Sequence, residues 1–96
     1  MEYNEKHHLK IADSVNYKKF IDYLNDKDTI TSKEIIKLFN LSQYFDDDKT
    51  DIQMLCDIII GTASIKSNKF QWNWIFHTKE NKGEYPDYKI IWHDEN

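Results

Sequence analysis

Polar side chains are spaced two or four positions apart in one stretch near the end of the chain and recur in a second stretch after it. Gln71, Asn73 and His77 lie in the first stretch, and Lys89 and His93 lie in the second. Glutamine and asparagine can form paired hydrogen bonds with adenine, whereas lysine and histidine suit guanine or phosphate. These residue types therefore suit contact with nucleic-acid bases.

The intervening positions carry aromatic and aliphatic side chains. Strict alternation is typical of a half-buried β-strand, because successive side chains point to opposite faces. Two such runs, 70–77 and 88–93, are separated by a polar stretch and predict a β-hairpin. One face of this hairpin is aromatic, and the other carries the polar residues together with Ile75 and Ile91.

Four further lysines lie close to this hairpin in the sequence. Lys79 and Lys82 fall in the predicted loop, and Lys66 and Lys69 precede the first strand. We expect these ammonium groups to hold phosphates that flank the bases. Residues 58–93 carry five lysines against three carboxylates, a local charge of +2 in a chain of net charge −4. The alternative explanation is that the polar face is simply the solvated side of a sheet.

The aromatic face needs helices to cover it, and the preceding sequence predicts three. The first is expected to begin at Ser14 and to run to about Asn25, with an apolar stripe at i, i+3, i+4 and i+7. Residues 1–13 could form a short strand or extend this helix. We expect Trp72 and Trp74 to be buried against the helices.

The second helix has the clearest start. Thr31 and Glu34 have the spacing of a capping box, and Ile30 and Ile35 have that of a hydrophobic staple. Asn40 is expected to end the helix in the left-handed conformation. Residues 28–30, just before it, are expected to form a short strand.

The third helix is expected to begin within 46–50 and to end at Gly61. It carries more apolar residues than one buried stripe needs. Together with the segment 1–13, this surplus predicts a homodimer that buries the excess surface. The residues expected in the dimer contact are Met54, Ile58, Ile60, Leu9 and Ile11.

The order helix, short strand, helix, helix, hairpin resembles the winged helix-turn-helix superfamily over residues 14–93. The resemblance rests on the helix entry 28–35, the helix ending at Gly61 and the hairpin 70–93. It implies one α+β domain over residues 1–96, with three helices and a two- or three-stranded antiparallel wing. It also implies a protein that binds double-stranded DNA, although such domains serve as protein-docking modules as well.

The third helix departs from the family pattern, in which this helix presents polar and basic side chains to the major groove. It offers Asp51, Gln53 and Asp57 and has no basic residue after Lys49. We therefore expect the wing to read DNA. In this respect the chain resembles the TcpK-like relaxosome accessory proteins of clostridial conjugative plasmids. That resemblance implies a homodimer binding short repeated sites through the hairpin, as a plasmid or phage accessory factor at an origin of transfer.

Composition argues against other classes. No nucleotide-binding loop, catalytic constellation or zinc-ligand spacing is present, so we expect no enzyme, metal, cofactor or small-molecule substrate. Cys56, the only cysteine, is expected to be a core thiol. No apolar run could span a bilayer and no signal peptide follows Met1, which predicts a cytoplasmic protein. The alternative function is a small acidic inhibitor, such as a phage anti-defence or immunity protein, binding a basic enzyme through 46–57.

Overall fold

The structure, a computed structural model, describes residues 5–25, 27–44, 49–75 and 86–93. These residues form an α+β fold, as predicted, with four α-helices and one antiparallel sheet. The helices are α1 (Glu5–Asp13), α2 (Tyr17–Leu24), α3 (Ser32–Phe39) and α4 (Lys49–Ser67), with a 3-10 turn, η1, at Leu41–Gln43. The strands are β1 (Thr29–Thr31), β2 (Phe70–Ile75) and β3 (Asp87–Trp92).

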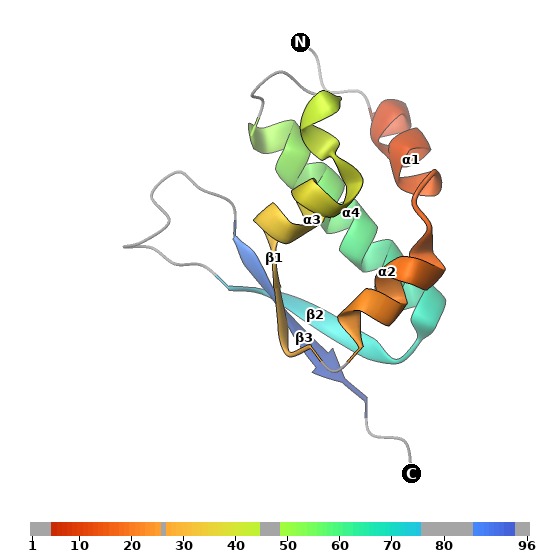
Figure 1. The fold of residues 1–96 in the computed structure, drawn as a ribbon, viewed down its shortest axis with the longest axis vertical. Helices are drawn as coiled ribbons and strands as arrows, with labels where there is room; N and C mark the ends of the chain where they lie inside the picture. Colours follow the sequence, from red (N-terminus) through yellow and green to blue (C-terminus); the bar gives the residue numbers. More distant parts are fainter. Residues whose placement is uncertain (1–4, 26, 45–48, 76–85, 94–96) are drawn as a thin grey trace.

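Helix α4 is the centre of the fold. It contacts α1, α2 and α3 and also packs against β2 (Figure 1). Its side chains Leu55, Cys56, Ile59, Ile60 and Ala63 are fully buried. Most of the apolar surface of this helix is therefore buried in the interior of the domain, although Met54 and Ile65 are exposed.

The first helical region differs from the prediction. The chain forms two helices there, because α1 runs to Asp13 and the Ser14 hydroxyl donates back to the carbonyl of Ile11 at 2.6 Å. The cap of α2 is Asn16, whose Oδ1 accepts from the backbone N–H of Lys19 at 3.2 Å. The predicted cap at Ser14 is wrong, because its hydroxyl completes the preceding helix.

Helix α3 follows the local signals. Thr31 is its N-cap, with Oγ1 accepting from the Glu34 N–H at 3.0 Å, and Asn40 closes it at a φ of 49°. Ile30 and Ile35 on either side of the cap are both fully buried. The Glu34 carboxylate accepts from the hydroxyls of Thr31 and Tyr23. The predicted cap at Thr31 and the predicted end at Asn40 are confirmed. The predicted short strand is present but lies one residue later than expected, at Thr29–Thr31 instead of 28–30.

Helix α4 does not end at Gly61. It continues to Ser67, and Asn68 at a φ of 54° takes the left-handed position that was predicted for the glycine. Glycine inside a helix costs about 1 kcal/mol relative to alanine, a modest penalty. Burial of Ala63 and the 2.8 Å hydrogen bond from Ser64 Oγ to the Phe70 carbonyl favour the extra turns.

The sheet has the order β1-β3-β2, and both pairs are antiparallel. In the predicted hairpin, Phe70 lies opposite Trp92 and Ile75 lies opposite Asp87. Strand β1 pairs Thr29 with Lys89 and so adds a third strand beside β3. The predicted strand from Phe70 is described to Ile75, and its last two positions lie outside the described residues.

The inner face of the sheet packs on the helices, with Phe70, Tyr88 and Ile90 buried. The prediction for the tryptophans is only partly correct. Trp72 is half-buried, whereas Trp74 is 47% exposed and is not a core residue. Cys56 is a core thiol as predicted, and burial raises its pKa to about 12.

Part of the apolar surplus assigned to a dimer contact is buried within the single chain. Helix α1 packs on α4, and both Ile11 and Ile60 are buried within the single chain. Ile58 is partly buried against the core, while Met54 and Leu9 stay exposed. The N-terminal helix therefore supplies much of the cover that the sequence alone assigned to a second copy. Within the described part of the chain, no helix is long and apolar enough to cross a membrane.

Candidate nucleic-acid interface

The outer face of the sheet presents the predicted polar residues in rows across the strands. The middle row runs from Thr29 on β1 through Lys89 on β3 to Asn73 on β2, and all three side chains are exposed. Gln71 lies opposite Ile91 in the next row, and these two are exposed as well. Neighbouring strands are about 4.8 Å apart, so the three-strand row is about 10 Å across.

The third row is Thr31, Asp87 and Ile75, all partly buried. Here the face is three strands wide, whereas the row of Gln71 and Ile91 is formed by β2 and β3 alone. The polar patch therefore narrows from a three-stranded sheet to a two-stranded ribbon towards Gln71.

Hydrogen bonds to α3, to α4 and to the connection between α2 and β1 hold this sheet. Trp92 Nε1 donates to the Lys27 carbonyl at 2.8 Å, Ser64 Oγ donates to the Phe70 carbonyl, and Ser32 Oγ donates to the Pro86 carbonyl. These bonds attach both β2 and β3 to elements on the inner side. The outer face is therefore carried on a fixed scaffold rather than on a free hairpin, which favours precise presentation of side chains.

Asp57 of α4 is the most connected of these attachment points. Its Oδ1 accepts from the Tyr88 hydroxyl at 2.5 Å and from Trp74 Nε1 at 3.1 Å. The ring of Trp72 lies edge-on to the rings of both Trp74 and Tyr88, with centroids 5.4 and 5.5 Å apart. Desolvation by burial and then the Asp57 contact raise the pKa of Tyr88, so its hydroxyl stays a donor. The Asp57 carboxylate therefore joins α4 to the hairpin.

Lys69 and His93, both predicted to contact DNA, lie next to each other where β2 begins and β3 ends. The backbone N–H of His93 donates to the Lys69 carbonyl at 2.8 Å, just beyond the pair Phe70 and Trp92. Both Lys69 and His93 have exposed side chains. They extend the polar face by one row beyond the pair Gln71 and Ile91.

Lys66 is not brought to this face. It lies in the last turn of α4, and its Nζ is 5.5 Å from the centroid of the Tyr17 ring on α2. His77, Lys79 and Lys82 lie outside the described residues. Of the nine residues predicted to contact DNA, Gln71, Asn73, Lys89, Lys69 and His93 therefore form one continuous surface.

Sequence reasoning missed two contributors to this surface, Thr29 and Thr31. Their alternation with buried Ile30 was available as a signal, because it places both threonines on one face. What the sequence could not supply was the strand to which β1 would pair. Pairing with β3 puts Thr29 directly beside Lys89.

The chemistry of the surface is mainly hydrogen bonding, with little net charge. Lys89 and Lys69 are its lysines and Asp87 is its carboxylate. Amide, hydroxyl and ammonium donors next to exposed Ile91 could contact base edges and thymine methyl groups. Among the described residues, no group of three or more histidine, cysteine, aspartate or glutamate side chains could hold a metal ion.

Comparisons of the chain with protein-family models, with curated proteins and with solved structures give no match.

Proposed function

We propose that this protein binds double-stranded DNA in a sequence-specific manner through the outer face of its sheet, and that its fold is a winged helix. The observation that carries the proposal is the exposed row Thr29, Lys89 and Asn73, continued by Gln71. A major groove about 12 Å wide accepts a two-stranded β-ribbon. The outer face narrows to two strands at Gln71 and Ile91.

The order α2, β1, α3, α4, β2 and β3, together with the sheet order β1-β3-β2, supports the winged-helix assignment. On this assignment α4 would be the groove-reading helix of the family, and α1 an addition before the first helix. However, α4 is enclosed by three helices and β2, and its Asp57 is engaged by Tyr88 and Trp74. This enclosure favours reading by the wing.

Each base-reading role is proposed from chemistry and position. Asn73 and Gln71 would bind adenine, Lys89 would bind guanine or phosphate, and Lys69 would bind a flanking phosphate. Few cations lie on the surface, so a single copy would bind non-specific DNA weakly. We propose that two copies act on paired or tandem sites, as in an accessory factor of a plasmid or phage at an origin of transfer.

The test is selection of binding sequences from a random 20-bp duplex library, followed by mobility-shift assays on the enriched duplex. We expect Asn73→Ala to weaken binding by about 1–3 kcal/mol and to relax specificity at one base pair. Lys69→Ala should weaken all sequences equally and reduce the salt slope by about one unit.

Gln53→Ala on α4 is the matched control, because it removes an amide of the same kind from the helix. Thermal melting of each variant would show that it is folded. The proposal is wrong if no motif is enriched, or if Gln53→Ala abolishes binding while Asn73→Ala has no effect.

The alternative function, an inhibitor that uses the acidic segment 46–57, receives little support from the described residues. Asp57 accepts two hydrogen bonds from the hairpin, and residues 46–48 lie outside the described part of the chain. Capture of a basic host enzyme, with no DNA motif enriched, would favour the inhibitor.

A further inference from the structure

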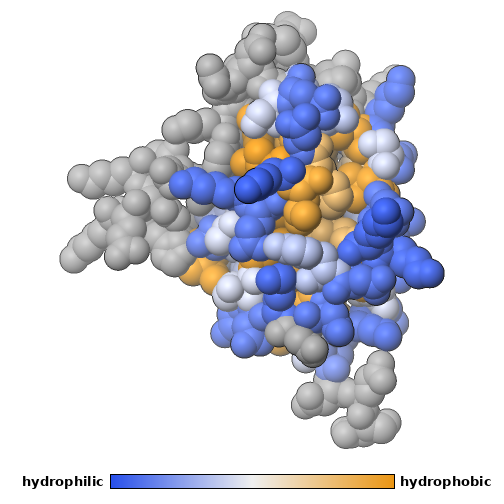
Figure 2. Space-filling model, in the orientation of Figure 1, coloured by the Kyte–Doolittle hydropathy of each residue, from blue (hydrophilic) through white to orange (hydrophobic). Residues whose placement is uncertain are grey.

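A groove lies on the side of the helical layer where α2 faces α3 and η1. It encloses about 440 Å³ and is lined from the α1–α2 junction, from α2, and from the end of α3 with η1. In Figure 2 an apolar surface fills the hollow between two polar margins. This volume falls within the range of about 300–1,000 Å³ typical of small-molecule sites.

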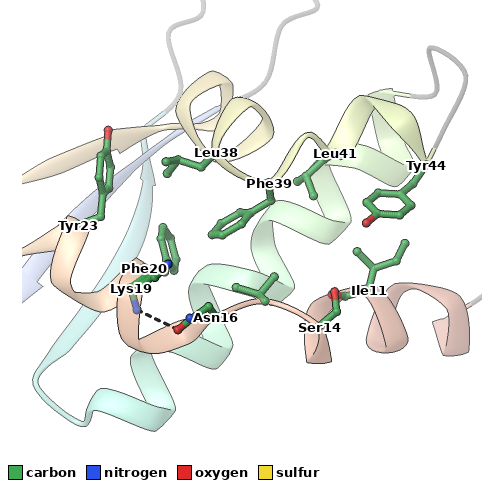
Figure 3. A pocket seen from close by; sticks show the side chains of 11 residues that line it. Ile11, Ser14, Asn16, Lys19, Phe20, Tyr23, Leu38, Phe39, Leu41 and Tyr44 are labelled. Carbon is green, nitrogen blue, oxygen red and sulfur yellow. Dashed lines mark hydrogen bonds between the residues drawn. The ribbon is translucent and has the colours of Figure 1, made fainter.

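The walls of the groove are apolar. Ile11 and Phe20 approach from one side, and Leu38, Phe39 and Leu41 approach from the other (Figure 3). Val15 lines the groove as well. The rings of Phe20 and Phe39 meet edge to face, with centroids 5.3 Å apart. Leu38 is 44% exposed, so the groove leaves apolar surface in contact with water. A ligand with an apolar body would remove that surface from water.

The polar groups that line the groove come from Ser14, Asn16, Lys19, Tyr23 and Tyr44. Lys19 is the one charged residue among those that line it, and no carboxylate lines it. Within the part of the chain that the structure describes, no salt bridge engages the Lys19 ammonium. Asn16 and Ser14 lie on the same side, at the α1–α2 junction (Figure 3). The groove therefore combines an apolar interior with a single cation.

We propose that this groove binds a small amphipathic carboxylate, with its hydrocarbon body packed against Phe39 and Leu38 and its carboxylate at Lys19. Charge complementarity selects the anion, since a cationic amphiphile of equal length would meet the lysine without a compensating acid. None of the lining residues belongs to the outer face of the sheet. The proposal is therefore independent of DNA binding.

The direct test is titration of the intact ¹⁵N-labelled protein with octanoate, followed by amide chemical shifts. We expect saturable shifts concentrated at Val15, Leu38 and Phe39, and none at Gln71 or Asn73. Octyltrimethylammonium at the same concentrations should give no saturable shifts. An absence of saturation up to 5 mM octanoate, or equal binding of the cation, would overturn the proposal.

Matched variants assign the two halves of the site. Lys19→Gln should weaken octanoate binding about fivefold, whereas Lys18→Gln, at the neighbouring exposed lysine outside the groove, should not change it. Leu38→Glu, at an exposed position, should abolish binding with little change in the melting temperature. Equal effects of Lys18→Gln and Lys19→Gln would contradict the role of Lys19.

The ligand-free protein supplies the remaining control. If dilution alone shifts the amides that line the groove, and sedimentation shows a matching dissociation, the groove belongs to an interface between two copies. That outcome would overturn the ligand proposal without bearing on DNA binding by the sheet.

Discussion

The two faces of the sheet are made from the same strands but differ in burial. On the inner face, Phe70, Tyr88 and Ile90 are at most 3% exposed, and they meet the helices. On the outer face, Asn73 and Lys89 are exposed although they alternate with those residues along the same chain. The inner face therefore contributes most of the stability of the sheet, and the outer face is free to differ in its chemistry.

Trp74 is the instructive exception on the inner face. Its alternation places it with Phe70, yet it is 47% exposed and its indole N–H binds Asp57. Membership of the inner face therefore does not guarantee burial, because β2 is an edge strand and has a neighbouring strand on one side only.

The largest expected effect separates these two inner-face residues. Phe70→Ala should lower the free energy of unfolding by about 3–5 kcal/mol, because it opens a cavity in the core. Trp74→Ala should cost less, since half of its surface is already in water. Urea denaturation measures both losses. A larger loss for Trp74→Ala would contradict the view that burial on the inner face determines the contribution to stability.

Asp57→Asn tests the attachment of the sheet to α4. We expect a loss of about 1–3 kcal/mol, because the partly buried carboxylate is replaced by a weaker, neutral acceptor for Tyr88 and Trp74. Chemical denaturation gives the loss, and tryptophan fluorescence should report a change around Trp74. An unchanged midpoint would show that the hairpin needs no such attachment.

Tyr88 should also make stability depend on pH in the alkaline range. Its pKa is raised in the folded protein, so the stabilising contribution is fully present below pH 10 and is lost as the pH rises above 10. The expected slope is at most about 1.4 kcal/mol per pH unit for this one proton. Comparison of unfolding free energies at pH 9.5 and 11 should show a smaller loss in Tyr88→Phe than in the unaltered protein.

Thr31 is an outer-face residue that also has a structural role, because it caps α3. Thr31→Ala should cost about 1 kcal/mol through loss of the α3 cap, whereas Thr31→Ser should retain most of the stability. Thermal melting distinguishes the two variants. Equal losses for alanine and serine would show that the methyl group, not the hydroxyl, matters here.

The smallest expected effect belongs to Asn73. Asn73→Ala on the exposed face should change the free energy of unfolding by no more than about 0.5 kcal/mol. Urea denaturation measures this, and the result also validates the DNA-binding assay with the same variant. A loss above 1 kcal/mol would mean that the outer face contributes to stability after all.

Elements with local signals could be predicted from the sequence. The cap of α3 at Thr31, its end at Asn40 and the hairpin all depend on residues a few positions apart or on strict alternation. The same alternation placed Gln71, Asn73 and Lys89 on one face. Each of these features depends on the backbone geometry of a single element. Its sequence pattern is therefore the same whatever the tertiary structure.

Features that depend on distant contacts could not be predicted. The sequence favoured a helix end at Gly61, but burial of Ala63 and the bond between Ser64 and Phe70 carry α4 on to Ser67. It also gave no reason for α1 to cover α4, and so it assigned that apolar surface to a second copy.

The sequence by itself therefore determined which side chains share a face and where the strongest caps lie, because these follow from the periods of the helix and the strand. Tertiary structure decided which strand β1 joins, that Trp74 stays in water, and that Asp57 binds the hairpin instead of facing solvent. It also decided that α2 and α3 leave an apolar groove beside Lys19. The physical reason is that burial and hydrogen bonding between elements depend on residues far apart in the chain, which no local pattern encodes.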